Sequence, residues 1–148
     1  MKRTLLLAAG AAGLALTGAA PAFAATATTT TETCSYSGLQ SGLSTKVCAD
    51  VSSDGSVQLF GQIALAGPPS PGGPGPQPQY LNVTLSGNVV GGDSLGTVQQ
   101  NVIFRATTTK ITGVGGTVAC GSTVHASFSV SSYPWFNTPV TVDVPVNC

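Results

Sequence analysis

The chain of 148 residues is long enough for one domain of ordinary size, and only 7% of its residues are charged. The chain has five Lys and Arg in total and five Asp and Glu, and its cations are not clustered. This argues against nucleic acid as a partner, because neutralising phosphates needs clustered cations. A surface this poor in charge must be covered by Ser, Thr, Asn, Gln and Gly, and it would bind through shape and hydrogen bonds.

Residues 1–24 have the three parts of a secretory signal peptide. Lys2 and Arg3 form a positive n-region, an apolar run occupies 4–16, and Ala-Phe-Ala at 22–24 is an A-x-A cleavage site. The strongly apolar part is about half the roughly 20 residues that a spanning helix needs, so a transmembrane anchor is the weaker interpretation. No second apolar run follows, so we expect a secreted, extracellular chain that no membrane retains after cleavage.

Residues 25–33, ATATTTTET, would begin the mature chain. They include six Thr and no large apolar side chain, which predicts a flexible tail with nothing to bury, although Thr is also a good strand former. Such a segment can add as a strand to another protein's sheet edge or lie in a groove. The candidate partner-binding residues here are Ala25, Thr26, Ala27 and Thr28, and the alternative is a disordered leader.

The four cysteines all lie after the cleavage site, at Cys34, Cys48, Cys120 and Cys148. An even number in an exported chain predicts two disulfides, and four cysteines allow three connectivities. We favour the local pairs, 34 with 48 and 120 with 148. An immunoglobulin-type pair of 48 with 120 would be expected to enclose a Trp, and the chain's one Trp lies outside that interval. A zinc site is excluded by spacing, since there is no C-x-x-C and only one His.

From residue 46 onward, β-strand patterns dominate the chain. Apolar and polar residues alternate with period two in five segments, separated by Gly, Ser or Pro: 57–65, 81–86, 98–106, 124–130 and 140–146. One polar face per strand predicts antiparallel sheets packed into a small all-β sandwich, immunoglobulin-like or related, over residues 34–148. Pro145 cannot donate to a ladder, so the last strand should lie at a sheet edge.

A long connection separates the first two of these segments. Pro and Gly fill ten of the thirteen positions in 67–79, GPPSPGGPGPQPQ, which predicts a surface loop with polyproline-like stretches.

Three patterns that could carry chemistry have simpler interpretations. Residues 50–55 resemble the start of a calcium loop, but Gly61 stands where the acidic twelfth ligand is needed, so a tight turn at 53–56 is favoured. His125 lies on the polar face of its strand, and no nucleophile elbow or oxyanion loop accompanies it. The five acids show no spacing that supports glycoside hydrolysis. We therefore expect no enzyme activity, no metal and no cofactor.

The aromatic cluster Tyr133, Trp135 and Phe136 surrounds a Pro in the connection between the last two strands. Loop aromatics are common binding anchors, which makes these three residues the second group of candidate partner-binding residues. The alternative is a plug that closes one end of the core. Tyr80, at the end of the Pro-rich loop, could join either arrangement.

With its leader, its Thr-rich segment 25–33 ahead of Cys34 and its small disulfide-bonded domain, the chain resembles small secreted bacterial β-sandwich proteins. In outline it is similar to the adaptor subunits of umbrella toxin particles, whose extended N-terminus docks into a large partner. This resemblance implies a non-enzymatic adaptor that binds another secreted protein through its tail. A small secreted protease or amylase inhibitor and a small-molecule carrier remain as alternatives.

Overall fold

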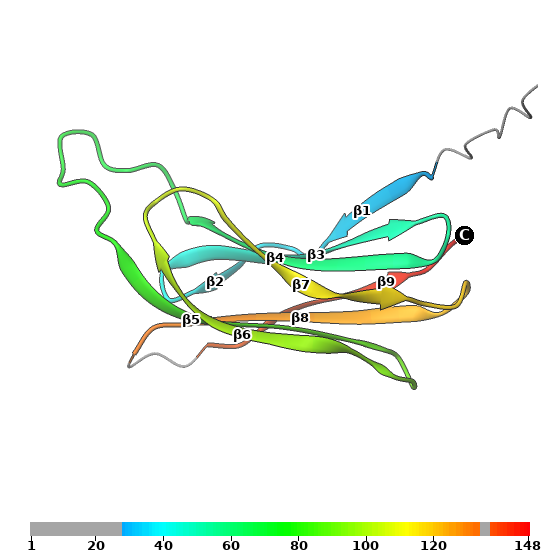
Figure 1. The fold of residues 1–148 in the computed structure, drawn as a ribbon. Coiled ribbons are helices and arrows are strands. Elements are labelled where there is room, and N and C mark those ends of the chain that lie inside the picture. Colours follow the sequence, from blue (N-terminus) through cyan, green and yellow to red (C-terminus); the bar gives the residue numbers. More distant parts are fainter. Residues whose placement is uncertain (1–27, 134–136) are drawn as a thin grey trace, which may run out of the picture.

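The computed structural model describes residues 28–133 and 137–148, and these form two antiparallel sheets packed face to face (Figure 1). Sheet A has the order β1-β3-β4-β7, with β2 also paired to β3, and consists of β1 (Thr30–Cys34), β2 (Gly38–Gln40), β3 (Leu43–Ser52), β4 (Ser56–Leu65) and β7 (Thr109–Thr117). Sheet B has the order β6-β5-β8-β9 and consists of β5 (Gln79–Val89), β6 (Ser94–Phe104), β8 (Thr123–Ser131) and β9 (Val140–Pro145). The predicted all-β sandwich is confirmed.

The core lies between the two sheets and follows from the period-two pattern, because alternate side chains of each strand point to the same face. In β8, Val124, Ala126, Phe128 and Val130 are all buried, while the residues between them are partly exposed. The same alternation occurs in β3, β4 and β5. The inner faces therefore form one apolar layer, and the polar residues are left on the two outer faces.

Two glycines allow the sheets to approach closely. A Cβ at Gly61 of β4 would overlap the ring of Phe128 in the opposite sheet, and one at Gly87 of β5 would overlap the Leu59 side chain. The largest side chains of each sheet thus rest on backbone of the other. This close approach brings the side chains of the two inner faces into contact and so gains dispersion energy.

The strand connections use the turn chemistry that their residues provide. The predicted turn at 53–56 is confirmed: Gly55 has φ 81° and the Ser56 N–H donates to Asp54 Oδ1 at 2.9 Å. Between β2 and β3, Ser41 and Gly42 have φ values of 52° and 75°, as a two-residue type I′ hairpin requires.

Both predicted disulfides are present. Cys34–Cys48 joins directly opposite residues of β1 and β3, and Cys120–Cys148 attaches the C-terminal residue to the chain just before β8. Disulfides persist in oxidising compartments, so the two bonds suggest a protein of such a compartment. Among residues 28–133 and 137–148, no helix is long and apolar enough to cross a membrane.

The prediction of a flexible tail over 25–33 is wrong for its last four residues. Residues 30–33 were expected to be flexible, but they belong to β1, which pairs with β3 in the register Thr30↔Ser52 to Cys34↔Cys48. The β-forming preference of Thr prevails here because β3 offers a free edge and the disulfide holds the end of β1 against it. The period-two alternation also did not predict three parts of the sheets, namely β2, the start of β3 and the whole of β7. In β7, three Gly interrupt the alternation.

The remaining fold predictions are confirmed with small shifts. The Pro/Gly-rich loop is exposed and joins β4 to β5, with Gln79 already in β5. The last strand, β9, lies at the edge of sheet B and ends at Pro145.

Gly61→Ala should lower the free energy of unfolding by about 1–3 kcal/mol, because the added methyl displaces the Phe128 ring from a packed core. Urea unfolding followed by circular dichroism measures this. Gly67→Ala is the matched control: no atom lies within 4 Å of its Cβ position, so its effect should stay within about 0.5 kcal/mol. Equal stability of the two variants would contradict the close approach of the sheets.

Candidate functional site

The described residues that adjoin the two predicted binding segments lie at opposite ends of the strands (Figure 1). At one end, here called the N-terminal end, the Thr29 carbonyl accepts from the Ser53 N–H at the β3–β4 turn. At the other, here called the aromatic end, Tyr133 lies two residues beyond Ser131, which pairs with Asn82 near the start of β5. The ten residues of β3 correspond to roughly 33 Å between these ends.

Some of the candidate residues lie outside the described part of the chain. These are the signal peptide at 1–24 and the partner-binding candidates Ala25, Ala27, Thr26, Trp135 and Phe136. Thr28 is described and exposed, and it precedes β1 by two residues.

The aromatic end exposes large apolar side chains instead of burying them. Tyr133 is 100% exposed, so it is not a plug in the core. Tyr80 is 78% exposed and pairs directly across the strands with Ile103, which is 43% exposed. Both belong to the outer face of sheet B, because they share the parity of the outward-facing Asn82 and Asn101. The structure thus brings Tyr80 and Ile103 to the end at which Tyr133 lies.

The connection that carries Tyr133 is held by a network of side-chain hydrogen bonds. Asn137 Nδ2 donates to the Val130 carbonyl at 2.7 Å and to Ser41 Oγ at 2.9 Å. The Ser41 N–H donates to Asn137 Oδ1 at 3.3 Å, and Ser41 Oγ also accepts from the Ser132 N–H at 3.0 Å. The β2–β3 hairpin of sheet A is therefore tied to both flanks of this connection.

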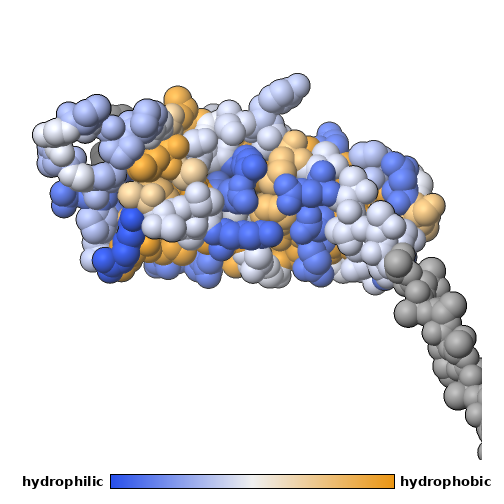
Figure 2. All heavy atoms as spheres, turned by 90° about the horizontal axis from the view of Figure 1, so that it is seen from above, coloured by the Kyte–Doolittle hydropathy of each residue, from blue (hydrophilic) through white to orange (hydrophobic). Residues whose placement is uncertain are grey.

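A pocket of about 420 Å³ adjoins this network and is lined by Leu39, Ser41, Gly42 and Asn137. Leu39 is 74% exposed, so the pocket offers apolar surface to solvent beside the aromatic connection. In Figure 2, which looks onto sheet A, apolar areas are larger toward the end with the Pro/Gly-rich loop. The aromatic end therefore combines several exposed apolar groups with the partly buried amide of Asn137.

Charge is divided between the two ends. The cations of the described chain, Lys46, Arg105 and Lys110, lie in the half that contains the aromatic end. Lys110 Nζ lies 3.4 Å from the centroid of the Phe60 ring, on the outer face of sheet A. The acids lie in the other half, at Glu32, Asp50, Asp54, Asp93 and Asp143. Sequence order hides this division, which arises only when the strands are aligned.

His125 has a partner that the sequence analysis missed. Its Nδ1 lies 2.6 Å from Asp143 Oδ1, because the two residues are directly opposite on β8 and β9. Both side chains are well exposed, at 39% and 65%. The carboxylate orients the imidazole, but the described contacts bring no nucleophile to the pair, and an exposed pair of this kind contributes at most about 1 kcal/mol to stability.

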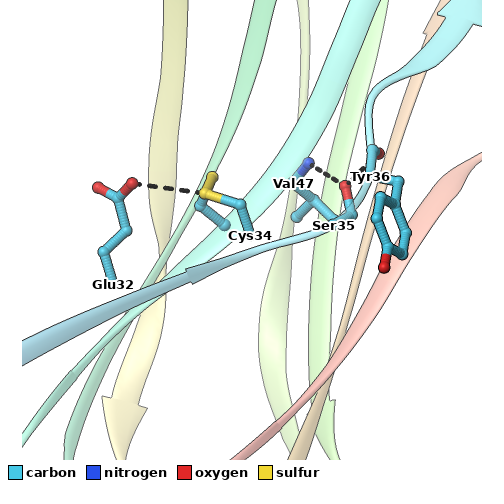
Figure 3. Close-up of a disulfide and its surroundings, with 6 residues drawn as sticks. Glu32, Cys34, Ser35, Tyr36 and Val47 are labelled. Carbon is cyan, nitrogen blue, oxygen red and sulfur yellow. Dashed lines mark hydrogen bonds between the residues drawn. A yellow bond between two sulfur atoms is a disulfide. The ribbon is translucent and has the colours of Figure 1, made fainter.

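Glu32, Cys34 and Cys48 form the one cluster of potential metal-ligating groups in the described residues, with ligand atoms within 4.8 Å of one another. Glu32 Oε1 lies 3.4 Å from Cys34 Sγ (Figure 3). The sulfurs of Cys34 and Cys48 are bonded to each other, so neither can bind a metal as a thiolate or donate a proton to the Glu32 carboxylate. The contact is a close approach without a hydrogen bond, and the cluster is not a metal site.

No family model matches the chain, and neither a curated protein nor a solved structure is significantly similar to it.

Asn137→Ala should lower the free energy of unfolding by about 1–3 kcal/mol, because it removes the donors to Val130 and Ser41 in a partly buried network. Thermal or urea unfolding measures this loss. Asn147→Ala, a change of the same size at an exposed position near the other end, should have less than about 0.5 kcal/mol effect. If both variants behave alike, the network does not hold the aromatic connection.

Proposed function

We propose that this protein is a secreted, non-enzymatic interaction module that acts as an adaptor between two binding partners. The N-terminal segment serves one partner, which is another secreted protein, and the aromatic end serves the second. The observation that supports this proposal is that Thr29 and Ser131, which adjoin the two candidate binding segments, lie at opposite ends of one sandwich.

The character of each end supports the proposal. Interface anchors are typically aromatic residues in a surface that is otherwise poor in charge, and Tyr80 and Tyr133 meet this description. The N-terminal segment continues directly from a sheet edge, which favours pairing with an extended partner. Two ends with different chemistry can hold two different proteins without competition.

An inhibitor is less well supported. The exposed Pro/Gly-rich loop is the natural candidate for insertion into an enzyme, but neither disulfide brackets it, so it lacks the preorganisation that lowers the cost of binding.

The adaptor function predicts that the two ends lose different partners when they are changed separately. The tagged chain would be captured from culture supernatant in three forms: unchanged, without residues 25–33, and with Tyr80→Ser and Tyr133→Ser together. Mass spectrometry should show that each altered form loses one protein and keeps the other.

Thr141→Ser, on the polar outer face of sheet B, is the matched control and should keep both proteins. Loss of the same protein from both altered forms would show a single binding surface. Retention of every protein by both would contradict the proposed use of these segments.

A further inference from the structure

Strand β1 is the outermost strand on its side of sheet A. It pairs with β3 on one side only, and no strand of the described chain pairs with its other edge. Its first three residues are exposed. A strand in this position presents unpaired backbone groups that can receive a further strand.

The register shows which backbone groups are free. The Ser53 N–H donates to the Thr29 carbonyl and the Ser35 N–H to the Val47 carbonyl, so the odd-numbered residues are those hydrogen-bonded to β3. In an antiparallel ladder the hydrogen-bonded and non-hydrogen-bonded pairs alternate. The N–H and C=O groups of Thr30, Glu32 and Cys34 therefore point to the open edge.

The end of β1 has a defined limit. Ser35 Oγ accepts from the Val47 N–H at 3.1 Å and donates to the Tyr36 carbonyl at 2.9 Å, which turns the chain out of the strand (Figure 3). Together with the neighbouring disulfide, this anchors β1 to β3. The open edge is thus a fixed template of about three alternate residues.

The charge beside this edge is uniformly negative. Glu32 lies directly opposite Asp50 in a non-hydrogen-bonded pair, the arrangement in which side chains come closest, and Asp54 follows in the adjoining turn. The cations of the described residues lie in the other half of the molecule. Like charges directly opposite are destabilising, and a cation placed beside Glu32 would relieve this.

The same negative charge makes a second copy of this chain an unfavourable partner for the β1 edge. Two β1 strands that met edge to edge around a two-fold axis at Glu32 would bring their glutamates together. Charged residues on edge strands commonly prevent such self-association. A strand that carries Lys or Arg would instead be attracted to this edge, because its cations would lie beside the acids.

We propose that the open edge of β1 is a strand-addition site for an extended segment of the partner that carries Lys or Arg beside Glu32. This inference rests on the proposed function, because it specifies the chemistry of the partner that binds the N-terminal end. The partner's backbone bonds to Thr30, Glu32 and Cys34, and its cations distinguish it from neutral or acidic strands.

Synthetic peptides test the site without the natural partner. The probe is acetyl-Thr-Lys-Thr-Lys-Thr-Lys-Thr-amide, and its twin has Glu in place of each Lys. Amide resonances of the full mature chain would be followed during titration. The basic peptide should shift the Thr30, Glu32 and Cys34 amides in a saturable way and the acidic twin should not, with the preference weakened by added salt.

Thr30→Pro removes one donor from the open edge and leaves the ladder to β3 intact, since Pro is tolerated in edge strands where its N faces solvent. It should weaken peptide binding about tenfold, as expected for one lost backbone hydrogen bond. Thr30→Ala keeps the N–H and is the matched control, which should bind as the unchanged protein does. Glu32→Gln should reduce the preference for the basic peptide over its twin.

A peptide N-methylated at alternate positions gives the same test without changing the protein. Methylation of one parity should abolish binding and methylation of the other should preserve it. Three results would each overturn the proposal. They are equal binding of the basic and acidic peptides, unchanged peptide binding by the Thr30→Pro variant, and sedimentation of the protein alone as a dimer. Those results would leave the two-partner capture experiment unaffected, because it does not depend on this peptide.

Discussion

Burial of apolar side chains between the two sheets is the interaction on which the rest of this structure depends. Each buried Val, Leu, Ile or Phe contributes about 1.5–3 kcal/mol, and this layer requires that one face of every central strand be apolar. Gly61 and Gly87 set how close the sheets come, because Phe128 and Leu59 rest against them. The outer faces are consequently mostly polar, apart from side chains such as Tyr80, Ile103 and Phe60, and the candidate sites lie at edges and ends.

At the aromatic end, where the β8–β9 backbone ladder ends, side chains bond to the backbone groups of β8 that the ladder leaves free. Strand β9 begins opposite Phe128, so the next groups of β8 would lack partners. Gln40, which is buried, accepts from the Val130 N–H at 2.8 Å and donates to the Phe128 carbonyl at 3.1 Å. This amide acts as a short substitute for a strand and connects β2 of sheet A to β8 of sheet B. Together with Asn137 and Ser41, it gives the aromatic end a rigid base.

The two ends of the sandwich differ in the kind of surface that they offer. The aromatic end has exposed Tyr80 and Tyr133 and the half that contains it has the cations, whereas the N-terminal end has an open strand edge flanked by acids. Neither surface is continuous in sequence: Tyr80 and Ile103 meet because β5 and β6 pair, and Glu32 meets Asp50 because β1 pairs with β3. These juxtapositions are long-range, so local patterns could not reveal them.

The sequence by itself determined the fold class, the exposed Pro/Gly-rich loop and the edge position of β9, because period-two alternation and Pro chemistry act over short distances. It favoured the local disulfides among three connectivities, and the structure decided between them. Only the tertiary structure decided that Thr30–Cys34 is a strand, that Tyr133 points to solvent, that His125 meets Asp143 and that opposite charges separate to opposite ends. Each of these depends on strand register, and register is set by the packing of the whole core and not by neighbouring residues.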